Sequence, residues 1–271
     1  MTLPQPHDAS RFAMFVNRPR IWAVSSIHAE IGRLEAVHDA IAQRLKPGDG
    51  LIYLGNLSGY GAAHFAIVNE LLNFRRAFIA RPGSNETDLV FLRGAQEEMW
   101  HKLLELQFAP NPGEIFDWML DHGLGPTIDA YGLRINDCRI AIREGTVAIT
   151  RWTASVRAAF NIAPGHAALH AALRRAAYTS DGKLLFVHAG IDPARPMSAQ
   201  RDSFWWGAPG FLDLAAPYGG FIRVIRGFDP KQGGLIETPH AVSMDGGCGR
   251  GGKLLAACFM PDGSIAESFE A

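Results

Sequence analysis

The feature that most constrains the fold is a strand-like run that passes through a polar loop into an amphipathic helix. Ile21–Val24 is short, apolar and β-branched at its ends, and the polar loop after it carries Ser25, Ser26 and His28. Apolar residues then recur at helical spacing at Ile31, Leu34, Val37, Ile41 and Leu45. This order is typical of an α/β protein, where such a loop lies at the end of the sheet that binds ligands.

Three later segments repeat the pattern of an apolar strand followed by a polar, glycine-containing loop. They are Leu51–Gly61, Val90–Glu98 and Leu184–Pro193. Glycine allows the backbone to turn sharply where a strand ends. The four segments therefore predict strands whose loops gather at one rim of a sheet.

The size and charge of the chain favour one domain with no bulk electrostatic preference. Its 271 residues are 48% hydrophobic, which is enough to bury a substantial core. Lys and Arg number 26 against 27 Asp and Glu, so we expect neither nucleic acid nor an anionic membrane surface as a partner.

The cysteines and the N-terminal segment predict a reduced, cytoplasmic protein. Cys138, Cys248 and Cys258 are odd in number and include no CxxC pair, so a disulfide framework or a zinc knuckle is disfavoured. Residues 1–20 are rich in proline and polar residues, and we assign them to an N-terminal lead-in without a signal-like apolar core. No apolar run approaches the length that spans a bilayer.

The order and spacing of these segments resemble the calcineurin-like metallophosphoesterases, in particular their bacterial serine/threonine protein phosphatase branch. That family has the motifs GDxHG, GDxxDRG, GNHE, HAGxxP and a late GHT. The corresponding segments here are Ser25–Ala29, Gly55–Gly61, Gly94–Glu97, His188–Pro193 and Gly227–Asp229. The resemblance covers nearly the whole chain, although many of the chemically active motif positions are changed.

The resemblance implies an α/β fold, a sandwich of two mixed β-sheets flanked by helices. Residues 21–271 would form a single metallophosphoesterase-like domain with a helical insert at about residues 110–180. Short apolar strands at 221–225 and 254–259 lie in a glycine-rich C-terminal part, and we expect them at an antiparallel edge of the second sheet.

The family's metal ligands are largely absent from the matching positions. Two-metal phosphoester hydrolysis uses two cations about 4 Å apart, held by anionic ligands and sharing an activated water. By the resemblance, the ligand positions are Ser26 and His28 for the first metal, Asn56 for the bridge, and Ala95, His188 and Phe228 for the second metal. No carboxylate remains among them, and the two histidines belong to different metals.

The groups that would act on the substrate are also replaced. The family's GNHE histidine, which protonates the leaving group, corresponds to Gln96, and its phosphate-clamping DRG arginine corresponds to Tyr60. Glutamine has no titrating proton to donate.

Three functions remain open from the sequence. The preferred one is a catalytically inactive pseudophosphatase that acts by binding or scaffolding, with no cofactor expected. The second is a hydrolase with a remodelled or mononuclear site that binds Mn, Zn or Fe weakly through His28, His188 and a substitute carboxylate. Candidates for that carboxylate are Asp229, Glu97 and Asp129. The third is a structural subunit whose cleft is packed shut.

Two arginines are candidates for anion binding at the predicted rim. Arg226 stands where the family has the first histidine of an HGHT phrase, and Arg93 precedes the GNHE-like segment. Loss of carboxylates beside added guanidinium groups favours anions, so we predict a phosphorylated protein or a phosphate-like anion as partner. The alternative is that Asp229 pairs with Arg226.

Overall fold

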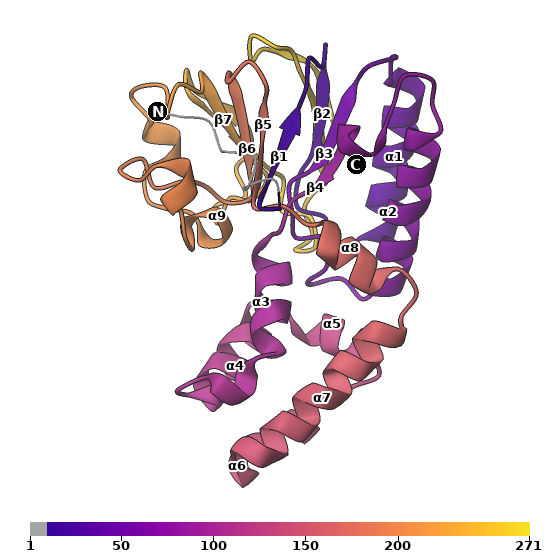
Figure 1. The fold of residues 1–271 in the computed structure, drawn as a ribbon, viewed down its shortest axis with the longest axis vertical. Helices are drawn as coiled ribbons and strands as arrows, with labels where there is room; N and C mark the ends of the chain where they lie inside the picture. The colour runs from indigo at the N-terminus through magenta and orange to yellow at the C-terminus, as the bar shows by residue number, and fades with distance from the viewer. Residues whose placement is uncertain (1–9) are drawn as a thin grey trace.

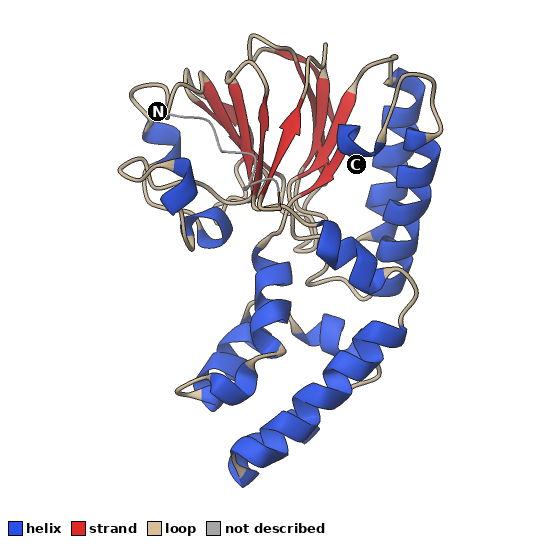
Figure 2. Ribbon diagram, in the orientation of Figure 1, coloured by secondary structure: helices blue, strands red, loops and turns tan. Residues whose placement is uncertain are grey.

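Two β-sheets lie face to face with helices on their outer sides, in a computed structural model that describes residues 10–271 (Figures 1 and 2). The six-stranded sheet has the order β1 (Phe12–Phe15), β5 (Ala176–Thr179), β6 (Leu184–Val187), β7 (Arg223–Arg226), β9 (Ala241–Asp245) and β8 (Gly234–Glu237). The five-stranded sheet has the order β11 (Ile265–Glu270), β10 (Leu255–Phe259), β2 (Ile21–Val24), β3 (Gly50–Tyr53) and β4 (Leu89–Phe91). Both sheets are mixed, which confirms the predicted metallophosphoesterase-type sandwich.

Strand β2 shows why its sequence is apolar throughout. Ile21 and Ala23 pack in the core between the sheets, whereas Trp22 and Val24 pack on the opposite face. That outer face is covered by α1 (Ile31–Arg44) and α2 (His64–Ile79) (Figure 1). A strand buried on both faces loses the alternation of polar and apolar residues.

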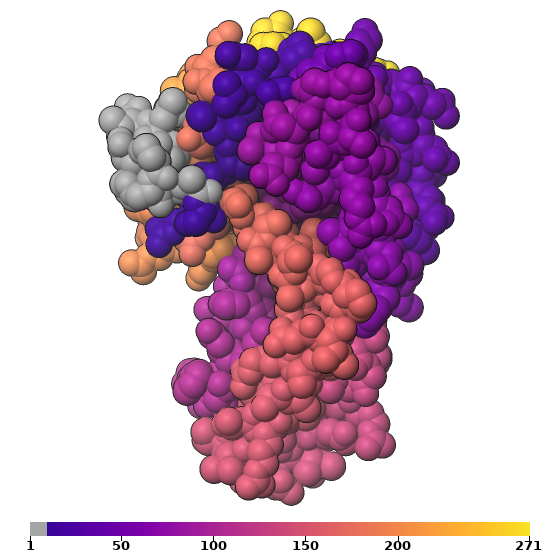
Figure 3. Space-filling model, turned by 45° about the vertical axis from the view of Figure 1, so that its right-hand side comes forward, coloured from indigo at the N-terminus to yellow at the C-terminus, as the bar shows by residue number. Residues whose placement is uncertain are grey.

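Most of the remaining helices form a protrusion beyond one end of the sandwich (Figure 3). They are α3 (Ala95–Leu103), α4 (Pro112–Asp121), α5 (Gly125–Ala130), α6 (Ile135–Glu144) and α7 (Thr146–Ile162). Helix α8 (His166–Ala172) follows at the junction with the sandwich, where Leu169 packs in the core beside α2. The protrusion has its own apolar core, which includes Trp100, Phe116 and Val156. The insert assigned to about residues 110–180 contains α4 to α8, and its last residues form β5.

Shorter helices complete the chain outside this protrusion. They are α9 (Ser203–Trp206) and the 3-10 turns η2 (Glu86–Asp88), η4 (Met197–Ala199) and η5 (Phe211–Asp213). A further 3-10 turn, η3 (Leu106–Phe108), belongs to the protrusion, where Leu106 packs in its apolar core. Within the described residues, no helix is both long and apolar enough to cross a membrane.

Two sequence-based assignments differ from the structure. Part of the predicted lead-in is strand β1, which pairs in parallel with β5, while residues 1–9 lie outside the described part. The predicted antiparallel edge strand at 221–225 is wrong, because β7 lies inside its sheet and runs parallel to both β6 and β9. Strand β10 is antiparallel to both of its partners, β2 and β11, as predicted, but it too is interior rather than an edge strand. Short apolar runs do not encode strand direction or position in a sheet.

Candidate functional site

The loops after β2, β3, β4 and β6 meet at one end of the sandwich, as the sequence predicts, and the loop after β7 joins them. The backbone N–H and hydroxyl of Ser26 both donate to the carbonyl oxygen of Gly227, over 3.1 and 2.9 Å. The Nδ1 atom of His188 donates to the carbonyl oxygen of Leu54 over 2.7 Å. These contacts place the family's metal-ligand positions in one buried cluster at the rim.

Asn56, at the position of the bridging carboxylate, has both ends of its amide engaged within the protein. Its Oδ1 accepts a hydrogen bond from the backbone N–H of Gln96 over 3.0 Å. Its Nδ2 donates toward Ser26 Oγ at 3.4 Å and His28 Nε2 at 3.3 Å. Asn56 has a left-handed backbone with φ of 52°, a conformation that asparagine tolerates better than most residues. A neutral, hydrogen-bonded amide therefore occupies the position that the resemblance assigns to the metal-bridging carboxylate.

Glu97 retains its carboxylate, but the backbone of two loops uses both oxygens. Oε2 accepts from the N–H groups of Gly94 and Asn56 over 2.8 and 3.0 Å. Oε1 accepts from those of Leu57 and Ser58 over 2.8 and 3.3 Å. Burial raises the pKa of Glu97, and the four backbone donors oppose that rise. Glu97 fastens the loop after β3 to the start of α3 and is not a free metal ligand.

His28 and His188 are buried, neutral imidazoles. Burial, followed by repulsion from His188, lowers the pKa of His28 to about 3, and burial lowers the pKa of His188 to about 4. Because Nδ1 of His188 donates to Leu54, its Nε2 carries a lone pair, and this buried atom has no partner among the described residues. Nδ1 of His28 is also buried without one. The ring of His188 lies against the ring of Phe228, with centroids 5.4 Å apart.

Tyr60 and Gln96, the replacements for the catalytic groups, contact neighbouring loops. The centroid of the Tyr60 ring lies 5.1 Å from that of the His28 ring. On the same tyrosine, the guanidinium of Arg250 lies 4.4 Å from the ring centroid of Tyr60 and donates a hydrogen bond to the Tyr60 hydroxyl. Nε2 of Gln96 donates to the carbonyl oxygen of His122 over 2.7 Å, which joins the rim to the helical protrusion. The sequence did not single out Arg250; its place in the glycine-rich run 246–252 was the available signal.

A glycine in that run allows it to approach His28. A Cβ atom at Gly249 would lie 2.4 Å from the Cβ of His28, and the φ of Gly249 is +82°. Only glycine fits such a close approach in a left-handed conformation without strain. The glycine-rich run 246–252 therefore packs against His28, which stands at a position that the resemblance assigns to the first metal.

Arg226 is paired, as the sequence allowed as an alternative. Its Nη2 lies 3.0 Å from Asp229 Oδ1, and its Nε donates to Ser243 Oγ over 2.9 Å. Arg226 and Asp229 are only 7% and 3% exposed, and the guanidinium lies over the ring of Phe211. Burial lowers the pKa of Arg226, and Asp229 opposes this. Neither the Arg226 cation nor the Asp229 carboxylate is free for a ligand.

The donor groups present do not fit a dinuclear metal site. Among the described residues, no three or more His, Cys, Asp or Glu side chains gather in a way that could hold a metal ion. The third carboxylate candidate, Asp129, is exposed on α5 in the helical protrusion. The two imidazoles are neutral, and the amide of Asn56 is already hydrogen-bonded within the protein. These groups cannot balance the positive charge of two adjacent divalent cations, which require anionic oxygen ligands.

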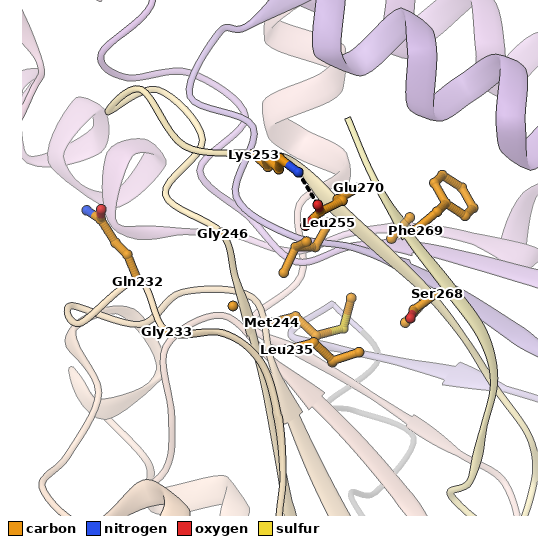
Figure 4. Close-up of a pocket in the computed structure, with 13 residues that line it drawn as sticks. Gln232, Gly233, Leu235, Met244, Gly246, Lys253, Leu255, Ser268, Phe269 and Glu270 are labelled. Atoms are coloured by element: carbon orange, nitrogen blue, oxygen red, sulfur yellow. Dashed lines mark hydrogen bonds and ion pairs between the residues drawn. The ribbon is translucent and has the colours of Figure 1, made fainter.

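A groove lies between the edge strands β8 and β11, and Figure 4 shows the residues that line it. Its volume is about 530 Å³, and its lining includes Leu235, Met244, Leu255 and Phe269. Lys253 and Glu270 form an ion pair at its border. None of the predicted site residues lines this groove.

Comparison with known proteins supports the fold. No protein-family profile matches the sequence, and no curated protein matches it. The structure is similar to one provisionally assigned as a diadenosine tetraphosphatase, with a TM-score of 0.55 and 20% identity over 96% of this chain and 98% of that one. It is also similar to a Saccharomyces cerevisiae serine/threonine phosphatase that resembles human phosphatase PP5, with a TM-score of 0.53 and 14% identity over 97% and 84%. The chain thus has the fold of calcineurin-like metallophosphoesterases.

Proposed function

We propose that this chain is a pseudophosphatase related to the bacterial serine/threonine phosphatases, with an eroded dinuclear site, and that it acts by binding or scaffolding. The observation that carries the proposal is Asn56. It stands where the bridging carboxylate is needed, it is neutral, and its amide is hydrogen-bonded to Gln96, Ser26 and His28. A phosphorylated protein or a phosphate-like anion would be its partner.

The surrounding substitutions support the same conclusion. Ala95 offers no ligand atom, and Phe228 places an apolar ring against His188. Gln96 cannot protonate a leaving group, because an amide has no proton that titrates near neutral pH. Without activated water and a proton donor, we expect phosphate esters to persist, since their uncatalysed hydrolysis is extremely slow.

A hydrolase with a remodelled or mononuclear metal site is the second candidate. The buried, unpartnered Nε2 of His188 favours it, because its lone pair could ligate a cation such as Mn, Zn or Fe. The unpartnered Nδ1 of His28 carries the ring proton, since its Nε2 accepts from Asn56, so His28 would have to change tautomer to contribute a second ligand. The substitute carboxylates count against it, since Asp229 is paired with Arg226 and Glu97 is held by four backbone N–H groups.

Turnover assays separate these candidates. Wild-type protein is incubated with an aryl phosphate and with phosphopeptides, with and without added manganese, beside a His188→Ala variant. We expect no phosphate release above the buffer rate from either protein. Release by the wild type that disappears in His188→Ala would overturn the proposal and establish the remodelled site.

A reconstruction provides the matching positive control. Ser26→Asp, Asn56→Asp, Ala95→Asn, Gln96→His and Phe228→His are combined in one variant, and each single change is made separately. We expect only the combined variant to bind divalent metal tightly, because a metal site needs its ligands jointly. Tight binding by a single variant would show that the present donor set is closer to a metal site than we propose.

A further inference from the structure

Three arginines converge where the segments before β1 and β5 meet the segment after β4. The backbone N–H of Arg175 donates to the carbonyl oxygen of Arg11 over 2.7 Å. The backbone N–H of Arg93 donates to the carbonyl oxygen of Arg174, also over 2.7 Å. Arg11, Arg93 and Arg175, which we call the arginine cluster, are thus brought together by backbone pairing between segments far apart in sequence.

Two of these side chains, Arg93 and Arg175, lie near the ring of a buried tryptophan, Trp205. The guanidinium carbons of Arg175 and Arg93 lie 5.3 and 5.8 Å from the ring centroid of Trp205, which is only 5% exposed. Cations are attracted to the face of an indole ring at such distances. Trp205 therefore lies beside two guanidinium groups that come from segments far apart in sequence.

Little negative charge offsets the arginine cluster. Nε of Arg93 lies 3.1 Å from Oε2 of Glu98, whose other oxygen lies 3.9 Å from Lys102. Within residues 10–271, neither Arg11 nor Arg175 forms an ion pair. Burial, followed by repulsion from Arg11 and Arg93, lowers the pKa of Arg175. Counted over the described residues alone, three guanidinium groups stand against one carboxylate and leave an excess of two positive charges, unlike the paired Arg226.

We propose that the arginine cluster, with Trp205 beneath it, is a binding site for a dianionic phosphate group. The planar N–H forks of arginine match the oxygens of a phosphate, and the excess of two positive charges matches a dianion. The site uses none of the former metal-ligand positions. It therefore stands whether or not the protein hydrolyses phosphoesters, and it goes beyond the proposed function.

Calorimetric titration with inorganic phosphate and with a phosphoserine peptide tests the site. The proteins are the wild type, Arg175→Gln and, as a matched control, Arg151→Gln, which removes an exposed arginine on α7. We expect the wild type and Arg151→Gln to bind equally, and Arg175→Gln to bind about tenfold more weakly or worse, since a charge-assisted hydrogen bond is lost. Binding should weaken as salt is raised.

The melting temperature without phosphate distinguishes a ligand site from a structural role. Arg175→Gln removes one of several crowded cations, so we expect its melting temperature in phosphate-free buffer to equal or exceed that of the wild type. Phosphate should raise the melting temperature of the wild type and not that of the variant. A clear fall in phosphate-free buffer would instead make Arg175 a structural residue and overturn the proposal.

Comparing the binding of inorganic phosphate, the phosphoserine peptide and acetate identifies the kind of anion that the site prefers. Binding of inorganic phosphate supports a free anion, and tighter binding of the phosphopeptide than of phosphate supports a phosphorylated protein; both uphold the site. If the wild type binds neither, or if Arg175→Gln leaves binding unchanged, the proposal is wrong. Acetate binding as tightly as phosphate would exclude the preference for a dianion.

Discussion

The rim cluster around Asn56, His28 and His188 and the arginine cluster differ in the charge of their side chains. The first contains neutral groups, with the amide of Asn56 hydrogen-bonded to its neighbours and two uncharged imidazoles. The second contains Arg93 and Arg175 beside Trp205, with Arg11 next to Arg175, and one carboxylate, that of Glu98. The comparison shows that the described residues of this rim carry little charge that could hold a metal cation, whereas an adjacent surface carries positive charge that an anion could neutralise.

A second contrast lies between retained backbone geometry and replaced side chains. Glu97 still ties two loops together through four backbone N–H groups, as a scaffold for the site requires. At the positions that the resemblance assigns to metal ligands, the chain has Ser26, Asn56, Ala95 and Phe228. The loop anchor at Glu97 therefore holds this rim through hydrogen bonds that involve no metal ion.

The largest expected effect comes from breaking that anchor. Glu97→Ala leaves four buried backbone N–H groups without an acceptor, and we expect it to lower the free energy of unfolding by about 5 kcal/mol. Urea denaturation measures this, with Glu97→Gln as an intermediate case that keeps one acceptor oxygen and the exposed Glu105→Ala as control. A loss below that of Glu105→Ala would show that Glu97 does not hold the loops.

The next effect tests the difference between a paired and an unpaired buried arginine. Asp229→Ala leaves Arg226 buried without its partner, which we expect to cost about 3 kcal/mol of stability. Because the double variant Asp229→Ala with Arg226→Met removes the stranded charge as well, it should recover much of this loss. Denaturation of both variants checks the ranking. Equal stability of Asp229→Ala and the wild type would contradict the pairing.

A pH effect is expected where the helical protrusion meets the sandwich, at another uncharged buried cluster. The hydroxyl of Tyr131 hydrogen-bonds to His64 Nε2 at 2.9 Å and to His166 Nδ1 at 2.6 Å. Burial, followed by repulsion from His166, lowers the pKa of His64 to about 3, and burial lowers the pKa of His166. The unfolded chain binds these protons first, so the contribution is complete above pH 6.5 and is lost as pH falls toward about 3.

Unfolding measured at several pH values checks this direction. Between pH 6.5 and 5, His64 alone should remove about 2 kcal/mol from the free energy of unfolding. His64→Gln should flatten the acid limb of the stability curve, whereas the exposed His101→Gln should leave its slope unchanged. A slope that His64→Gln does not alter would mean that His64 does not titrate as a buried neutral group.

The smallest effect is expected at the exposed arginine over Tyr60. Arg250→Ala removes a cation from the face of that ring, and we expect it to change stability by less than about 1 kcal/mol. Denaturation beside Arg250→Lys, which keeps the charge, measures the contribution. A loss as large as that of Asp229→Ala would show that Arg250 is an integral part of the closed rim.

The sequence predicted the parts of this molecule that depend on local pattern. Apolar runs ending in polar, glycine-containing loops located β2, β3, β4 and β6, and the helical spacing after Ile31 located α1. It did not predict β1, whose partner β5 lies more than 150 residues away in a segment with no local signal of pairing. For the same reason it did not predict the convergence of Arg175 and Trp205, because only the tertiary fold brings them together.

Within the site, residue identity predicted losses better than replacements. That Ser26, Ala95 and Phe228 stand for lost metal ligands stays a prediction from the resemblance, based on residue types that cannot supply the family's donor atoms. The hydrogen bonds of the Asn56 amide depend on the relative positions of three loops, so sequence alone could not assign them. The ion pair of Arg226 with Asp229 was one of two options until the structure placed both side chains together.

Metal stoichiometry tests the central claim most directly. The protein is purified without chelator, dialysed, and analysed for Mn, Fe, Zn and Mg by elemental analysis, beside the combined five-position reconstruction treated in the same way. We expect the wild type to retain far less than one metal ion per chain and the reconstruction to retain more. About two metal ions per wild-type chain would contradict the account, because it would show that the neutral Asn56 cluster still supports a dinuclear site.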